Sequence, residues 1–154
     1  MSGWTMSTAL DLAVAMEEQS IKLYTSAQEK ATRPGSKEML RELAVEEEKH
    51  RSRLLTAKMS PVRASSIGAA AERVIDLGIV DHLEGATLSP QADYQQILIY
   101  AGKREKEAHD LYMELAKKSQ DKGIEDMFAQ LAQEELRHKY RIEREYDDVV
   151  LAEM

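Results

Sequence analysis

The stretch Glu46-Glu47-Glu48-Lys49-His50 contains a glutamate and a histidine in the spacing Glu-x-x-His, and the same spacing returns at Glu135 and His138. Residues three apart are neighbours on one face of a helix, so each pair can present a carboxylate and an imidazole together. A glutamate run taken alone is more typical of a solvated helix face, because glutamate is rarely fully buried. The residues around the run decide between these interpretations.

Apolar residues on either side of each pair favour burial of one glutamate from each run. The apolar residues in line with Glu47 and His50, in steps of three and four, are Leu40, Leu43 and Leu54. Those in line with Glu135 and His138 are Phe128, Leu131 and Ile142. The sequence therefore predicts that these two pairs face the core. The neighbouring glutamates, expected to point away, are Glu46, Glu48 and Glu134.

The composition indicates an all-α protein with one domain. A chain of 154 residues can bury a sizeable core, and its 7 Gly, 3 Pro, one Phe and one Trp leave it rich in helix formers and poor in strand formers. The absence of Cys excludes disulfides, thiolate metal sites and cysteine nucleophiles. Any metal would have to be held by oxygen and imidazole nitrogen.

Charge and hydropathy exclude two classes of partner. A formal net charge of -7, with both signs intermixed, disfavours nucleic acid and anionic membrane surfaces, which attract clustered Lys and Arg. The sequence begins without a secretory signal pattern, and no apolar run approaches the 18 or so residues needed to cross a bilayer. We expect a soluble, cytoplasmic protein without a membrane partner.

The first half of the chain predicts a helical hairpin over residues 8–58. Ser7 or Thr8 can cap a helix that runs into the early thirties, and its inward stripe includes Glu17 and Tyr24. A break at residues 33–36 follows, after which Ser36 can cap a second helix that ends near residue 58. A break this short makes the two helices antiparallel neighbours.

The second half predicts a similar hairpin over residues 90–150. Ser89-Pro90 is a helix start signal for a third helix that reaches about residue 120 with Glu105 and Tyr112 facing inward, and a fourth helix ends near residue 150. Residues 59–89 form a long connector, with a possible short helix over 69–77 and a surface residue at His82. Such a connector suits the crossover of a ferritin-like four-helix bundle, here a single domain over residues 1–154.

One sequence offset relates the two hairpins. A separation of 88 residues joins four pairs of identical residues, which are Glu17 and Glu105, Tyr24 and Tyr112, Glu47 and Glu135, and His50 and His138. Distances from the two turns place all four glutamates and both histidines at one level of the bundle. The sequence therefore predicts a pseudo-symmetric structure with a polar layer in its core.

This layer requires cations. Burying one unpaired carboxylate costs several kcal/mol, and four would also repel each other. The alternative of protonated carboxyls requires strongly raised pKa values. Two divalent ions would balance four glutamate charges, and oxygen with imidazole ligation favours Fe or Mn, with Zn able to replace them. Di-iron and di-manganese carboxylate bundles have one Glu from each of two helices and Glu-x-x-His from each of the others.

At these motifs the sequence resembles the rubrerythrin-like branch of the ferritin-like superfamily, over residues 8–58 and 90–150. The resemblance implies two Fe ions bridged by Glu47 and Glu135. The terminal ligands that it implies are Glu17, His50, Glu105 and His138. It also implies that Tyr24 and Tyr112 hydrogen-bond the ligand carboxylates, although both tyrosines also suit core packing.

Two departures from the family pattern affect the expected chemistry. Rubrerythrins of the full-length type carry a further Glu about one turn after the third-helix ligand, and the nearby inward position here is Ala108, which leaves six ligands. His109 is one step further round and favours a partly exposed position over ligation. The Cys-rich rubredoxin domain is also missing, so an external electron donor, such as a rubredoxin-like protein, is expected.

Three functional hypotheses follow. The resemblance implies an oxidoreductase that reduces hydrogen peroxide, or dioxygen less efficiently. A second hypothesis is an iron-handling, ferroxidase or storage protein, and storage would require a large hollow shell. The third is a structural bundle with an adventitious metal site. A homodimer or higher homo-oligomer is expected, and the long connector permits chains to exchange hairpins.

Overall fold

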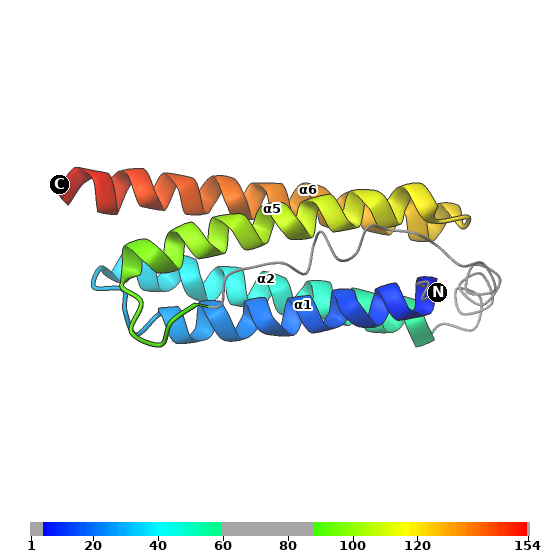
Figure 1. Cartoon of the computed structure of the whole chain (residues 1–154), viewed down its shortest axis with the longest axis horizontal. Coiled ribbons are helices and arrows are strands. Elements are labelled where there is room, and N and C mark those ends of the chain that lie inside the picture. Colours follow the sequence, from blue (N-terminus) through cyan, green and yellow to red (C-terminus); the bar gives the residue numbers. More distant parts are fainter. Residues whose placement is uncertain (1–4, 60–87, 154) are drawn as a thin grey trace.

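The helices that position the site are four long ones, arranged side by side (Figure 1). A computed structural model describes residues 5–59 and 88–153 of the chain. The helices are α1 (Met6–Ala27), α2 (Pro34–Met59), α5 (Tyr94–Lys118) and α6 (Lys122–Glu145), and α6 continues into a π-helical turn η1 (Tyr146–Val150) and a 3-10 turn η2 (Leu151–Glu153). The part of the chain that the structure describes contains no strand, which confirms the predicted all-α, ferritin-like four-helix bundle.

Helix α1 begins earlier and ends earlier than its sequence suggests. Its N-cap is Thr5, whose hydroxyl accepts a hydrogen bond from the Thr8 backbone N–H at 3.2 Å, so the predicted caps Ser7 and Thr8 lie inside the first turn. The helix ends at Ala27 rather than in the early thirties. Several hydroxyl residues stand close together here, and the one with extended backbone takes the cap.

The start of α2 also differs from the prediction. The helix begins at Pro34, and the first helical hydrogen bond runs from the Lys37 N–H to the Arg33 carbonyl. Proline suits the first helical position because it has no N–H to leave unpaired. The predicted cap Ser36 is instead buried within the first turn, at 3% exposure.

Helix α5 starts four residues after the predicted signal. Ser89 and Pro90 belong to a turn, closed by a 3.0 Å hydrogen bond from the Ala92 N–H to the Ser89 carbonyl. Asp93 caps the helix in a reciprocal capping box with Gln96, which satisfies two backbone N–H groups at once. Two satisfied donors explain why the helix starts here and not at the proline.

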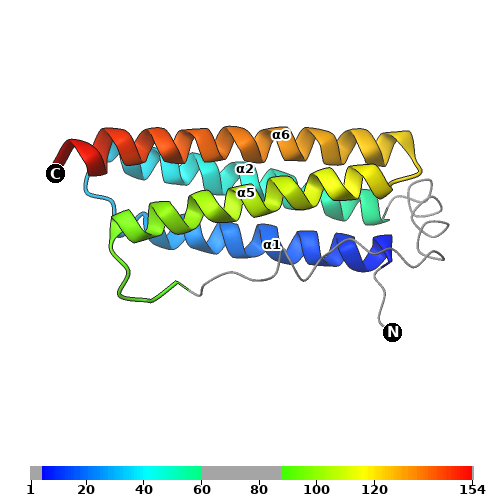
Figure 2. The same cartoon turned by 45° about the horizontal axis from the view of Figure 1, so that its top comes forward.

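The two helical hairpins, α1 with α2 and α5 with α6, pack face to face (Figure 2). The end of α2 and the start of α5 lie at opposite ends of the bundle, so a connection between them has to span its length (Figure 1). The predicted connector itself, with its short helix over 69–77 and His82, falls almost wholly on residues 60–87 and lies outside the described residues. No helix in the described ranges is both long and apolar enough to cross a membrane.

A polar layer divides the apolar core into two parts. One part includes Leu10, Leu54, Leu111, Leu115, Phe128 and Leu131. The other includes Ala27, Leu40, Leu43, Leu98, Ala101 and Ile142. Between them lie the inward glutamates and histidines of all four helices. The apolar residues on both sides hold the backbone of each helix in place at this layer.

Candidate metal centre

The polar layer contains six buried ionisable side chains. Helices α1 and α5 each contribute one glutamate, and α2 and α6 each contribute a glutamate and a histidine three residues later. All six are at most 5% exposed, and they are Glu17, Glu47, His50, Glu105, Glu135 and His138. The structure thus brings together every residue that the sequence predicts as a metal ligand.

The six side chains form two overlapping groups. The first consists of Glu17, Glu47, His50 and Glu135, and the second of Glu47, Glu105, Glu135 and His138. In each group the potential ligand atoms all lie within 4.8 Å of one another. Glu47 and Glu135 belong to both groups, which is the arrangement needed for carboxylates that bridge two ions.

Each histidine directs its Nδ1 atom at the carboxylates. His50 Nδ1 lies 2.7 Å from Glu135 Oε1, 3.0 Å from Glu47 Oε1 and 3.6 Å from Glu17 Oε1. His138 Nδ1 lies 3.3 Å from Glu47 Oε1, 3.6 Å from Glu105 Oε2 and 3.7 Å from Glu135 Oε1. The two imidazole rings are stacked, with centroids 5.5 Å apart.

Several of these atoms are buried and make no hydrogen bond within the described part of the chain, despite their short separations. They are Glu17 Oε2, both carboxylate oxygens of Glu47, Glu105 Oε2, Glu135 Oε1, and Nδ1 of His50 and of His138. Buried polar atoms are usually hydrogen-bonded, and each orphan atom costs about 1–3 kcal/mol. Carboxylate and imidazole groups that converge in this way fit a site for cations, so the residues present suit a pair of metal ions.

Two tyrosines cross the bundle to hold the terminal glutamates. Tyr24 of α1 donates a hydrogen bond to Glu105 Oε1 of α5, and Tyr112 of α5 donates one to Glu17 Oε1 of α1 at 2.5 Å. Both tyrosines are 1% exposed and pack in the core. Each tyrosine therefore both contacts a candidate ligand and packs in the core. The second carboxylate oxygen of each glutamate, Glu17 Oε2 and Glu105 Oε2, is buried without a hydrogen-bond partner among the described residues.

The pKa values of the four glutamates in the layer show how strongly their charges interact. Burial raises the pKa of Glu17 to about 7, with a further contribution from Glu47, and burial also raises the pKa of Glu105 and of Glu135. Burial opposes ionisation of Glu47 too, but its contacts with His138 and His50 hold its pKa below the ordinary value. Four carboxylates in one dry layer do not ionise together without added positive charge.

The pKa values of the two histidines are raised, whereas burial ordinarily lowers the pKa of an imidazole. Burial alone would lower the pKa of each, but the carboxylates of Glu17 and Glu47 beside its ring raise the pKa of His50 to about 9. Glu105 and Glu47 likewise raise the pKa of His138 to about 10. Without metal, these protons partly balance the carboxylates, and bound cations would have to displace them.

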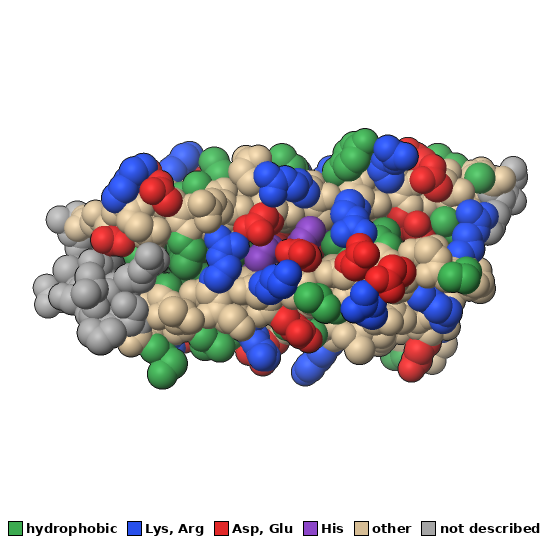
Figure 3. Space-filling view, turned by 180° about the vertical axis from the view of Figure 1, so that it is seen from behind, with side chains coloured by type: hydrophobic (Ala, Val, Ile, Leu, Met, Phe, Trp, Pro, Cys, Tyr) green, Lys and Arg blue, Asp and Glu red, His purple; other side chains and the backbone are tan. Residues whose placement is uncertain are grey.

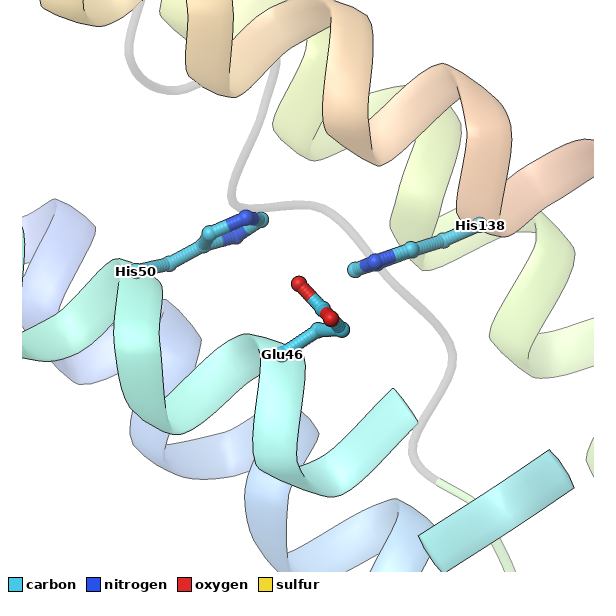
Figure 4. Close-up of side chains that lie close together, drawn as sticks. All are labelled: Glu46, His50 and His138. Atoms are coloured by element: carbon cyan, nitrogen blue, oxygen red, sulfur yellow. The ribbon is translucent and has the colours of Figure 1, made fainter. Parts of the chain in front are cut away.

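Two glutamates outside the layer differ from their prediction. Glu46 and Glu134 were expected to point away, yet each lies beside the histidines. Glu134 Oε1 is 3.7 Å from His50 Nε2, and Glu46 forms a further potential metal-holding group with His50 and His138 (Figure 4). Helical phase separates inward from outward residues, but these two occupy the flanks where α2 faces α6. The available signal was that the 88-residue offset also pairs Glu46 with Glu134.

Ala108 and His109 occupy the positions that the sequence indicated. Ala108 faces inward at 7% exposure and packs with the apolar core, so it supplies no further carboxylate to the layer. The His109 side chain is 23% exposed, and its Nδ1 lies 3.0 Å from Asp110 Oδ1. The expectation of a partly exposed histidine is confirmed, and the layer keeps six candidate ligands.

Comparison with protein families decides the relationship. The Rubrerythrin family model matches residues 8–77 and 96–154, which include nearly all of both hairpins and every candidate ligand. The chain belongs to the rubrerythrin family. Neither the curated proteins nor the solved structures that were compared gave a significant match. The resemblance inferred from the motifs is thus confirmed, and the carboxylate and histidine groups of this rubrerythrin-family chain are compatible with a di-iron site.

Proposed function

We propose that the chain is a di-iron oxidoreductase that reduces hydrogen peroxide, and dioxygen more slowly, with electrons from an external donor. The main support is the pair of overlapping groups that share Glu47 and Glu135. Two shared carboxylates would hold two ions close enough together for both to act on one substrate. Membership of the rubrerythrin family supports the same proposal.

The side chains of the layer have separate roles in this proposal. Glu47 and Glu135 would hold both ions, Glu17 with His50 would complete one metal site, and Glu105 with His138 would complete the other. Tyr24 and Tyr112 hold the terminal carboxylates in orientation through their hydrogen bonds. When bound and reduced, the iron pair would supply the two electrons that convert peroxide to water. The apolar residues on both sides keep bulk water from the layer.

The donor set favours iron. Carboxylate oxygens and imidazole nitrogens suit Fe and Mn, and Zn can occupy the same ligands when iron is scarce. We therefore propose two Fe ions as the cofactor, with Mn or Zn as possible replacements. Because the chain has no Cys, it has no thiolate to hold a redox centre of its own, and we propose that a separate rubredoxin-like protein supplies the electrons. We also propose that the chain acts in the cytoplasm as a homodimer or larger homo-oligomer.

The decisive experiment is anaerobic loading with ferrous iron followed by stopped-flow mixing with peroxide or with O₂. We expect two irons per chain, and oxidation that is much faster with peroxide than with O₂. Multiple turnovers with an added rubredoxin as donor would establish peroxidase activity. Oxidation by O₂ at an equal or faster rate, without turnover of peroxide, would exclude this function.

Ala108 supports a second candidate function. A layer with six ligands, and with alanine where a further carboxylate would stand, suits a centre that oxidises ferrous iron and releases or stores it. Rapid oxidation by O₂, followed by loss of ferric iron from the site, would favour this function. Size-exclusion chromatography with light scattering adds a test, because storage requires a large hollow assembly and a dimer could not provide one.

A further inference from the structure

Metal ions have to reach a layer that the four helices enclose. Two faces of the bundle are the closely packed interfaces within the hairpins, α1 with α2 and α5 with α6. The face between α1 and α5 is occupied at the level of the layer by Tyr24 and Tyr112, which are 1% exposed and bonded to Glu105 and Glu17. Entry through this face would require both hydrogen bonds to break.

The face between α2 and α6 is different. Histidine side chains are visible there, surrounded by acidic and basic side chains (Figure 3). Glu46 and Glu134 lie immediately outside the imidazoles, with side chains 39% and 27% exposed. His50 Nε2 is buried, has no hydrogen-bond partner within residues 5–59 and 88–153, and lies 3.7 Å from Glu134 Oε1. The His50 ring directs Nδ1 at the layer and Nε2 at Glu134, so it connects the layer with this face of the bundle.

The two glutamates at this face are not equivalent, although the sequence offset relates them. Arg53 donates hydrogen bonds to Glu134 at 2.7 Å and to Gln130 at 2.9 Å. The residue related to Arg53 is Arg141, and it donates to Glu42 at 2.7 Å. Glu42 stands where the second hairpin has the neutral Gln130, so Arg141 has a carboxylate partner other than Glu46.

As a result, Glu46 differs from Glu134 in having no arginine beside its carboxylate within the described part of the chain. Within residues 5–59 and 88–153 no arginine pairs with it, and its ion pair is a 3.7 Å contact to the exposed Lys49. Its carboxylate lies between the two imidazoles (Figure 4), and one ligand atom from each of these three residues falls within 4.8 Å of the others. Glu134 is the related residue on α6, and Arg53 donates to its carboxylate at 2.7 Å.

We propose that Glu46, together with His50 and His138, forms an entry site for divalent metal ions on the face between α2 and α6. The half-exposed carboxylate attracts a hydrated cation from solvent, and the imidazoles replace part of its water before the inner carboxylates receive it. A carboxylate at the mouth of a narrow site attracts cations and raises their association rate, by about tenfold. The inference rests on the proposed metal centre and assigns it a route of loading.

Cobalt(II) is a suitable probe, because it binds oxygen and nitrogen ligands, does not react with O₂ in such a site on the timescale of mixing, and absorbs visible light when bound. The metal-free full chain is mixed with Co²⁺ in a stopped-flow instrument. The variant is Glu46→Gln, and the matched controls are Glu134→Gln at the related position and Glu48→Gln, an exposed residue with the same change of charge.

We expect Glu46→Gln to slow Co²⁺ association about tenfold, with the final two ions per chain and the visible spectrum unchanged. Glu134→Gln and Glu48→Gln are expected to slow it less than about threefold. An unchanged rate in Glu46→Gln, or equal slowing in all three variants, would overturn the entry site. Loss of a bound ion in Glu46→Gln would also overturn it, by making Glu46 a permanent ligand. If the unmodified chain binds no Co²⁺, the metal centre itself is wrong.

Discussion

The first hairpin and the second hairpin are alike inside the bundle and different on its surface. In the layer, identical residues of the two hairpins occupy corresponding positions and make corresponding contacts, as in the crossed bonds from Tyr24 and Tyr112. At the face between α2 and α6, Arg53 and Arg141 correspond in sequence but bind different partners. Symmetry is thus retained where six groups must meet, and it is lost where single side chains face solvent.

Loss of a shared carboxylate should have the largest effect. Glu47→Ala and Glu135→Ala each remove a residue common to both metal-holding groups, so we expect the metal content to fall from two ions per chain to one or none. Symmetry predicts the same result for both variants. Metal analysis after anaerobic loading with Fe²⁺ measures it, with the exposed Glu48→Ala as control. Two ions retained in either variant would mean that its carboxylate does not bridge.

The crossed tyrosines test the symmetry of the layer. Tyr24→Phe and Tyr112→Phe each leave a buried carboxylate oxygen without its donor, and we expect the free energy of unfolding of the metal-free chain to fall by about 1–3 kcal/mol in both. Urea denaturation followed by circular dichroism measures the change. Tyr140→Phe, at a position 60% exposed, should change it by less than about 0.5 kcal/mol. A large decrease in stability for only one of Tyr24→Phe and Tyr112→Phe would show that the two halves of the layer are not equivalent.

Stability without metal should fall as pH rises. The pKa values of His50 and His138 are raised from 6.5 to about 9 and about 10, and that of Glu17 from 4.5 to about 7, so the folded chain binds more protons than the unfolded chain. The stability from the histidines is complete below pH 6.5 and is lost as pH rises through 9 to 10. The stability from Glu17 is complete below pH 4.5 and is lost through pH 7.

Thermal unfolding in the presence of a chelator measures this dependence. Between pH 6.5 and pH 9 we expect a loss of at least about 1 kcal/mol, which lowers Tm by about 2–4 °C for a chain of this size. The lowered pKa of Glu47 acts in the opposite direction and only as pH falls below its ordinary value of 4.5. His50→Gln and His138→Gln should each flatten the dependence by a similar amount. A Tm that rises over this range would show that the imidazoles are not protonated in the metal-free layer.

Substitution of Arg53 or Arg141 should have the smallest effects on stability, and the two variants should differ in the rate of metal binding. Their ion pairs are partly exposed, so Arg53→Gln and Arg141→Gln should each change the free energy of unfolding by less than about 1 kcal/mol. Only Arg53→Gln frees a carboxylate beside the histidines, and it should speed Co²⁺ association by about twofold to threefold. Arg141→Gln should leave that rate unchanged. Equal rates in both variants would mean that the asymmetry of the surface has no effect on metal loading.

The sequence predicted the helices and the polar layer because both depend on repeated patterns. Each of Glu17, Glu47, Glu105 and Glu135 stands in a stripe of apolar residues, and a charge inside such a stripe is recognisable without coordinates. Helix starts were less predictable. Thr5 competes with its neighbours for one cap, and the reciprocal bonds of Asp93 and Gln96 become visible only once the backbone is placed.

The surroundings of the layer could not be predicted from helical phase. Glu46 is adjacent in sequence to Glu47, and its approach to the imidazoles depends on how closely α2 faces α6. The choice of Arg141 between Glu42 and Glu46 depends on side-chain rotamers and on small differences in charge around them. Such choices involve energies near 1 kcal/mol, which a pattern of residue types does not resolve.

Each hairpin lends one carboxylate to the other. The group around His50 needs Glu135 from the second hairpin, and the group around His138 needs Glu47 from the first. Two copies of a single ancestral helix pair, related by a twofold axis, would therefore build both groups at once, and neither copy would build one by itself. Once both copies are part of one polypeptide, a surface residue of one copy can change without a change in the other. The offset pairs Glu42 with Gln130, so the two flanks of the layer differ here. In a symmetric pair of identical copies, the two flanks would be the same.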